Sequence, residues 1–90
     1  GRYADCARAM GAAAADADDG TAVAGLLDEL ARLNAELEVP SPKAYGIDES
    51  RYFSLLETMA EQALASGSPG NNPRVPSPAE IVDLYKQAWT

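Results

Sequence analysis

The chain has 90 residues, a formal net charge of −7 and no histidine, and these properties exclude several classes of function. The length allows one small domain at most. Ala accounts for much of the 47% apolar fraction, and Leu, Ile, Val and Phe together stay near the roughly 20% below which charged chains tend to be disordered. We therefore expect a thin core, so the chain is either marginally stable alone or a piece that packs on something larger.

The charge balance argues against nucleic acid and membrane partners. Seven Lys and Arg face fourteen Asp and Glu, without a basic cluster that would bind phosphates or an anionic membrane. No apolar stretch approaches the ~20 residues of a membrane span, and no signal peptide is visible. The single cysteine permits no internal disulfide, which is consistent with a reducing compartment, and we expect a cytoplasmic protein.

The lack of histidine removes the commonest acid–base catalyst near neutral pH and the commonest nitrogen ligand for metals. Ser–His–Asp triads, Cys–His pairs and His-bearing zinc sites are excluded within this chain. Cys6 has no base that can be named for it, and we expect it to be buried as a small apolar residue. We predict no catalytic residue and no metal ligand in this chain.

Four segments have helical periodicity and none reads as a strand, so the sequence predicts an all-α fold. The first helix is predicted over residues 2–15, followed by a polar turn over residues 16–20. Its expected inner face contains Tyr3, Cys6, Ala7 and Met10. The second helix is predicted over residues 21–38, with Thr21 as its N-cap. Its apolar stripe consists of Val23, Leu26, Leu27, Leu30, Leu33 and Leu37.

The second half of the chain predicts two further helices after a proline-containing linker. The third helix is predicted over residues 49–65 with Asp48 as its cap. Its expected buried face contains Tyr52, Leu55, Leu56, Met59 and Ala63. The fourth is predicted over residues 77–89, because Ser77-Pro78-Ala79-Glu80 is a capping box with Pro at the first helical position. Its inner stripe consists of Ile81, Leu84, Tyr85 and Ala88, with Trp89 at its end.

Two loops deserve a functional hypothesis. The acidic turn over residues 16–20 suggests a calcium loop, but Thr21 and Leu27 occupy the positions that need Gly and Glu. The loop over residues 66–76 holds three Pro, two Gly and two Asn, and is either a connection between helices or the rim of a site. We expect Asn71 and Asn72 to brace it and Arg74 to pair with a carboxylate of a neighbouring helix.

Three parts of the sequence, in order, resemble the iron-containing (group III) alcohol dehydrogenases. Residues 3–11 are similar to a helix that precedes a Leu-Asn segment in that family. Residues 33–40, followed by Tyr45-Gly46-Ile47, resemble the segment itself, with its Leu-Asn start and its Val-Pro end. Asn72-Pro73-Arg74, with residues 77–81 and 85–89 after it, looks like the family's C-terminal end. Order and spacing agree over essentially the whole chain.

The resemblance implies a larger enzyme with an N-terminal dinucleotide-binding α/β domain and an all-helical, dehydroquinate synthase-like domain. Residues 1–90 are then a fragment, the C-terminal part of that helical domain, without a complete cofactor-binding domain. The family's metal ligands, an Asp and several His, precede this part. The parent is expected to use Fe²⁺ or Zn²⁺ and NAD(P), with none of them bound by this segment. Its implied partners are the remainder of the parent enzyme, a small alcohol or aldehyde, and further copies in a homo-oligomer.

One candidate site residue, Ser68, follows from the resemblance. Several family members carry Cys near this place, in a loop that approaches the nicotinamide end of the site. Ser68 keeps a small polar group there but lacks the thiol. The resemblance therefore implies that Ser68 lies at the active-site rim and contacts the cofactor.

The leading hypothesis is that the chain is the C-terminal helical segment of a metal-dependent, NAD(P)-linked alcohol dehydrogenase, which is an oxidoreductase. The segment would support the metal-bearing helices and lend a rim loop, and is predicted to be inactive alone. A segment of a maleylacetate reductase remains as an alternative, because those relatives share the Asn-Pro-Arg end. A stand-alone helical module that binds a partner helix through its spare apolar faces is the alternative of another class.

Overall fold

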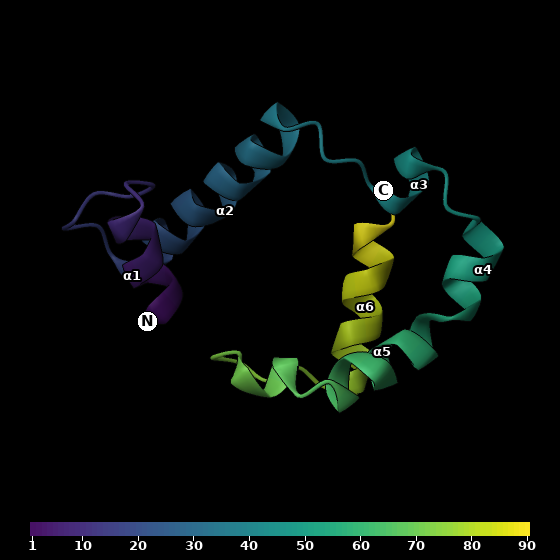
Figure 1. Cartoon of the computed structure of the whole chain (residues 1–90). Coiled ribbons are helices and arrows are strands. Elements are labelled where there is room, and N and C mark those ends of the chain that lie inside the picture. The colour runs from purple at the N-terminus through teal and green to yellow at the C-terminus, as the bar shows by residue number, and fades with distance from the viewer. The chain divides into compact units, whose positions relative to one another are not determined.

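The computed structural model describes residues 1–90, and all of its regular structure is helical (Figure 1). The chain forms six α-helices and one short 3-10 helix and has no strand, which confirms the predicted all-α class. Four of the α-helices are longer than one or two turns. The chain divides into two compact units, Gly1–Val39 and Pro40–Thr90, each with its own packing.

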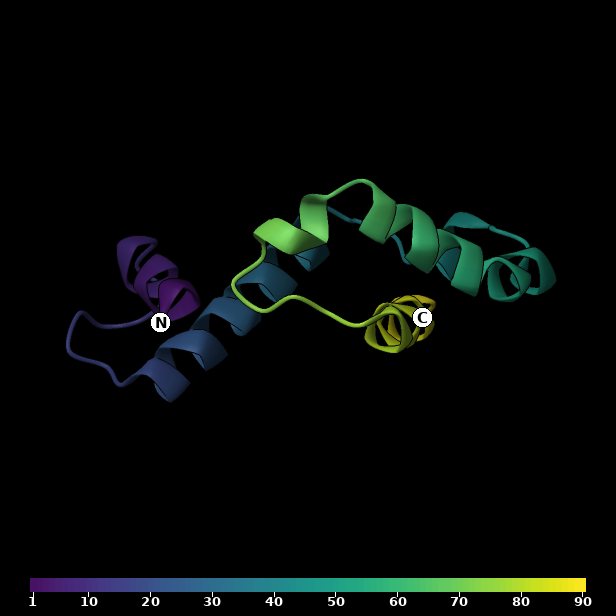
Figure 2. The ribbon, with the colours of Figure 1, turned by 90° about the horizontal axis from the view of Figure 1, so that it is seen from below.

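The first unit pairs α1 (Arg2–Ala9) with α2 (Asp19–Glu36), and the two helices lie side by side in both ribbon views (Figure 2). The prediction that the first helix reaches residue 15 is wrong. Gly11 adopts a φ of 76°, so the amide of Ala12 donates to the carbonyl of Ala7 at 2.9 Å and the amide of Gly11 to that of Arg8 at 3.2 Å. This left-handed cap ends α1 early and turns the alanines that follow back towards α2.

The face that α1 buries agrees with the prediction only at Ala7. Ala4 and Ala7 are buried against Ala22 and Leu26 of α2, whereas Cys6 is exposed. Tyr3 and Met10 of the predicted inner face are exposed as well. Small side chains on both helices let the two backbones approach closely.

Gly25 marks the closest approach within the first unit. A Cβ atom at this position would lie 2.4 Å from the carbonyl oxygen of Ala12, well inside van der Waals contact. Only glycine therefore fits at this point of α2 without displacing the backbone of the segment after α1.

The ends of α2 are set by hydrogen bonds within a few residues. Asp18, and not the predicted Thr21, is the N-cap, because its carboxylate accepts from the amide of Thr21 at 2.8 Å. At the other end Glu38 adopts a φ of 55°, and the amide of Val39 donates to the carbonyl of Asn34 at 2.9 Å. This is the same type of cap that Gly11 forms, here with a residue that has a Cβ atom.

Only part of the predicted apolar stripe of α2 is covered. Leu26 is buried, and Val23 and Leu33 are half-buried. Leu27, Leu30 and Leu37 are 61%, 45% and 70% exposed, respectively. The structure therefore leaves open an apolar face of the kind that the composition predicts for a helix that packs on a larger protein.

The second unit begins with a helix where the sequence analysis expected only a linker. Helix α3 (Pro42–Tyr45) has Ser41 as its N-cap, whose hydroxyl accepts from the amide of Ala44 at 3.1 Å. Gly46, with a φ of 100°, ends it. The Ser-Pro start is the same signal that predicts the last helix of the chain, so the start of α3 could have been predicted from the sequence.

The helix predicted over residues 49–65 is divided into α4 (Glu49–Ser54) and α5 (Leu56–Ala65). Asp48 caps α4 as predicted, accepting from the amide of Arg51 at 2.8 Å. The break lies at Leu55, which has a ψ of 1°. Just before it, the hydroxyl of Ser54 donates to the carbonyl of Arg51 at 2.8 Å, a local bond that favours bending of a helix.

The last helix, α6 (Pro78–Ala88), packs against α5, and the predicted capping box at Ser77 and Glu80 is confirmed. Leu56 and Ala60 of α5 and Ile81 and Trp89 of the C-terminal segment are buried. Leu84 and Ala88, predicted for the inner stripe, are exposed. The core of this unit is therefore as thin as that of the first.

Aromatic rings complete the packing at the C-terminal end. The ring of Trp89 lies 4.9 Å from that of Tyr52 and 5.6 Å from that of Phe53, measured between centroids. The hydroxyl of Tyr52 donates to the carbonyl of Tyr85 at 2.7 Å. The amide of Lys43 donates to the carbonyl of Trp89 at 3.1 Å, which joins the end of the chain to α3. Trp89 is thus a core anchor of the second unit.

Candidate functional site

The loop over residues 66–76 joins α5 to α6 and contains the candidate residue Ser68. It begins at Gly67, which adopts a φ of 79°. It then forms the 3-10 helix η1 (Ser68–Asn71), with Pro69 in its first turn. The remainder is irregular up to the Ser77 cap of α6.

Hydrogen bonds within the loop hold its first half. The hydroxyl of Ser66 donates to the carbonyl of Ala63 at 2.6 Å and accepts from the amide of Ser68 at 3.3 Å. The amide of Gly70 donates to the carbonyl of Gly67 at 3.2 Å, and the amide of Asn72 to that of Pro69 at 3.1 Å. The first half of the loop is therefore a braced turn that continues from the end of α5.

An ion pair holds the second half of the loop, as predicted. The guanidinium of Arg74 lies 2.7 Å from the carboxylate of Glu80 in the first turn of α6. The side-chain amide of Asn72 donates to the carbonyl of Arg74, which confirms the predicted brace for Asn72. A hollow of about 240 Å³ adjoins this pair and is lined by Arg74, Pro76, Glu80, Asp83, Leu84 and Gln87.

Ser68 itself is exposed at the first position of η1. Its amide donates to the hydroxyl of Ser66 in the same turn. A short hydroxyl at an exposed, braced turn can donate or accept a hydrogen bond to another molecule.

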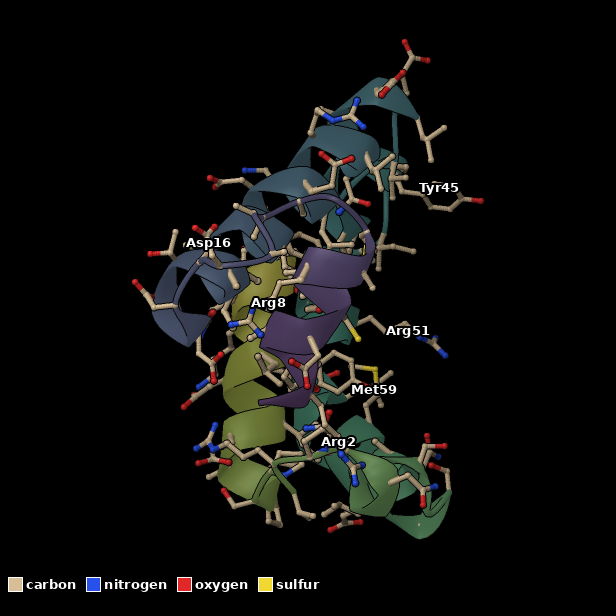
Figure 3. The ribbon with its side chains drawn as sticks, turned by 90° about the vertical axis from the view of Figure 1, so that its left-hand side faces the viewer. Arg2, Arg8, Asp16, Tyr45, Arg51 and Met59 are labelled. Atoms are coloured by element: carbon tan, nitrogen blue, oxygen red, sulfur yellow. The ribbon has the colours of Figure 1, made fainter.

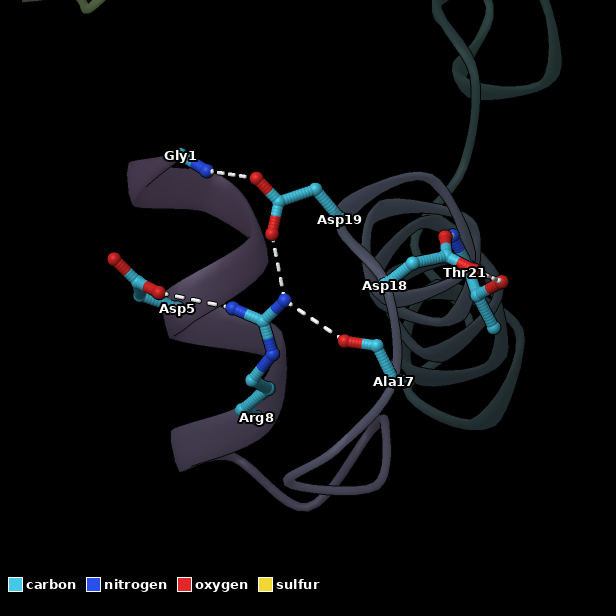
Figure 4. A network of polar contacts seen from close by, with 7 residues as sticks. All are labelled: Gly1, Asp5, Arg8, Ala17, Asp18, Asp19 and Thr21. Atoms are coloured by element: carbon cyan, nitrogen blue, oxygen red, sulfur yellow. Dashed lines mark hydrogen bonds and ion pairs between the residues drawn. The ribbon is translucent and has the colours of Figure 1, made fainter.

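The acidic turn over residues 16–20 is occupied by structural contacts (Figure 4). The carboxylate of Asp19 lies 2.6 Å from the guanidinium of Arg8. This cationic partner holds the pKa of Asp19 below its ordinary value. Arg8 also donates to the carbonyl of Ala17 at 2.9 Å, and its pKa is raised, chiefly by its hydrogen bond to Asp19. The turn is thus tied to α1 by Arg8.

The carboxylate of Asp18 caps α2 and is also engaged. It accepts from the amide of Thr21 at 2.8 Å and from its hydroxyl at 3.1 Å, and these bonds lower its pKa. No three His, Cys, Asp or Glu side chains of the chain are grouped so that they could hold a metal ion. The side chains present here therefore do not fit an iron or zinc centre.

The structure reveals an apolar groove in the second unit that the sequence analysis missed. It has a volume of about 520 Å³, within the usual size range of ligand pockets. It is lined by Pro40, Ser41, Pro42, Tyr45, Ile47, Arg51, Tyr52, Leu55 and Met59. Tyr45 and Arg51 extend outward from the ribbon (Figure 3). The signal that could have indicated it is the Ser41-Pro42 helix start, because α3 forms one wall.

No helix of the chain is both long and apolar enough to span a bilayer. Together, these features define an all-α segment that carries a braced loop, an open apolar groove and exposed leucines, and in which no metal centre is assembled.

Comparison with known families matches residues 1–89 to the Fe-containing alcohol dehydrogenase family, C-terminal. The chain therefore belongs to this family, as the resemblance in its sequence implies. Neither a curated protein nor a solved structure matches it significantly.

Proposed function

We propose that the chain is the C-terminal helical segment of a metal-dependent, NAD(P)-linked oxidoreductase that interconverts an alcohol and an aldehyde. The observation that carries the proposal is the family match over nearly the whole chain. Since the side chains here do not fit a metal centre, the metal and the nicotinamide cofactor would be held by other parts of the parent enzyme. The segment itself would be inactive.

The exposed leucines of α2 support a packing role for the segment. Leu27, Leu30 and Leu37 would be covered by the metal-bearing helices of the parent, which these side chains would hold in place. The parent would be a cytoplasmic homo-oligomer.

The 66–76 loop is the part of the segment that we propose to reach the active site. Ser66, Gly67 and the pair of Arg74 with Glu80 brace the loop, so a group that it carries has a reproducible position. Ser68, exposed in that loop, would contact the nicotinamide or the alcohol through its hydroxyl. Its role would be to shape the rim and to orient the bound molecule.

A bulky side chain at Ser68 tests this role in the parent enzyme. We expect Ser68→Trp to lower kcat/KM or to change the ranking of alcohol substrates. The free energy of unfolding should change by less than about 1 kcal/mol, since the site is exposed. Ser50→Trp, at an exposed position of α4, is the matched control and should leave kcat/KM unchanged. An unchanged kcat/KM of Ser68→Trp for every alcohol would show that the loop is only a connection between helices.

The reaction of a maleylacetate reductase is the alternative within the same class. Both reactions need the same kind of supporting segment, and Asn72-Pro73-Arg74 occurs in both groups by resemblance. Steady-state rates of the parent enzyme with maleylacetate and with simple alcohols would distinguish the two functions.

The exposed apolar stripe of α2 also favours a function of another class, a module that binds a partner helix. In that case the 90-residue chain should be a folded, monodisperse monomer that can bind a helix of another protein. Sedimentation velocity and circular dichroism of the chain would decide. Self-association or a loss of helix in isolation would instead support the packing role in a larger enzyme.

A further inference from the structure

Glu80 uses both of its carboxylate oxygens to join the 66–76 loop to α6. Its Oε1 accepts from the guanidinium of Arg74 at 2.7 Å, and its Oε2 accepts from the amide of Ser77 at 3.0 Å. The amide of Glu80 in turn donates to the hydroxyl of Ser77 at 3.2 Å. One side chain therefore both caps the helix and binds the loop.

A continuous path of hydrogen bonds leads from Glu80 back to the turn of Ser68. Arg74, which Glu80 binds, accepts through its carbonyl from the side chain of Asn72. The amide of Asn72 donates to Pro69, the residue after Ser68. At its other end the loop is held by Ser66, through the carbonyl of Ala63. The loop is thus anchored once on α5 and once on α6.

We infer that Glu80 is a positioning residue for the active-site rim, acting on Ser68 through Arg74 and Asn72. The inference rests on the proposed function, because only then does the position of Ser68 affect a reaction. Glu80 touches neither substrate nor cofactor in this role. Its carboxylate sets the second half of the loop relative to a helix that packs in the core of the second unit.

Glu80→Gln in the parent enzyme separates the two tasks of this side chain. Glutamine keeps an oxygen that can accept from Ser77, and it is accepted in capping boxes, but it loses the charge that binds Arg74. Arg74→Gln removes the same pair from the other side, and Arg74→Lys keeps the charge. The control is Glu61→Gln on α5, an exposed carboxylate that forms no ion pair with Arg74.

The first measurement is amide hydrogen exchange at Ser68, Gly70 and Asn72. We expect Glu80→Gln to speed exchange about two- to fivefold, the range for loss of an exposed ion pair, and Glu61→Gln to leave it unchanged. The double variant with Arg74→Gln should exchange no faster than either single variant, because both remove one interaction. Exchange rates equal to those of Glu61→Gln, or additive effects in the double variant, would overturn the inference.

The second measurement is kcat/KM, which should fall by at least about twofold in Glu80→Gln and recover in Arg74→Lys relative to Arg74→Gln. Faster exchange with unchanged kcat/KM, while Ser68→Trp still lowers it, would overturn the positioning role and leave the proposed function intact. If Ser68→Trp also has no effect, the proposed function of the loop is wrong. The exchange result would then still show that Glu80 anchors the loop.

Discussion

Gly25→Ala would test how closely the segment after α1 must pack against α2. The added Cβ would lie 2.4 Å from the carbonyl oxygen of Ala12, whereas ordinary contact begins near 3.4 Å. The backbone at Ala12 cannot yield easily, since its amide is bonded to the carbonyl of Ala7. Relief therefore requires the segment of Ala12 and Ala13, which packs against the core of the first unit, to move away from α2.

Two opposing effects set the expected magnitude of Gly25→Ala. Replacing Gly by Ala inside a helix favours the helix by about 1 kcal/mol. Forcing a methyl group into a packed contact costs about 1–3 kcal/mol, and a rigid backbone neighbour places this site at the upper end. We therefore expect a net loss of about 1–2 kcal/mol in the free energy of unfolding. This corresponds to a melting temperature lower by roughly 5–10 °C for a chain of this size.

Urea and thermal unfolding followed by circular dichroism would measure this loss. The matched control is Gly20→Ala in the same helix, where the new Cβ would meet only the carboxylate of Asp18 at 3.4 Å. That variant should be as stable as the unsubstituted chain or slightly more stable. If Gly25→Ala equals or exceeds Gly20→Ala in stability, the close approach of Ala12 to α2 does not limit the packing of the first unit.

Two further predictions concern the first unit. Glu38→Gly should stabilise the chain by about 0.5–1 kcal/mol in urea unfolding, because Glu38 has a left-handed conformation, with a φ of 55°, that glycine adopts without a Cβ clash. A less stable variant would mean that the Glu38 side chain contributes more to stability than the backbone strain costs. Since pairing with Arg8 holds the folded-state pKa of Asp19 below its ordinary value of 3.8, its contribution to stability is present above about pH 4 and is lost as the pH falls below that value. In acid titrations of unfolding, Asp19→Asn should flatten the pH dependence in that range, and an unchanged slope would show that the contact of Asp19 with Arg8 does not contribute.

Interactions between residues close in sequence made much of the second unit predictable. Asp48 and the Ser77–Glu80 capping box follow from hydrogen bonds that span three residues, so their residue types suffice to indicate them. The prediction that Arg74 pairs with a helix carboxylate holds for a similar reason, since Glu80 is only six residues away. The short helix α3, which was not predicted, has equally local signals at Ser41 and Gly46.

The 66–76 loop was predictable in composition but not in shape. Its prolines, glycines and asparagines indicate a braced turn, whereas the 3-10 conformation of Ser68–Asn71 depends on the bond that Ser66 makes to the end of α5. Of the apolar groove, the sequence could indicate only the wall that α3 forms, because the groove combines α3, α4 and α5 and exists only once the helix break at Leu55 has turned α4 against α5.

Periodicity, caps and prolines thus determine that the chain is helical and approximately where its helices begin and end, because these effects act within one turn of backbone. Which face of each helix is buried depends on the surface that approaches it. In α1, Tyr3, Cys6 and Met10 of the periodic face are exposed, whereas Ala7 of that face and its neighbour Ala4 are buried against Ala22 and Leu26 of α2. Burial is a property of two surfaces together, and the sequence of one helix describes only one of them.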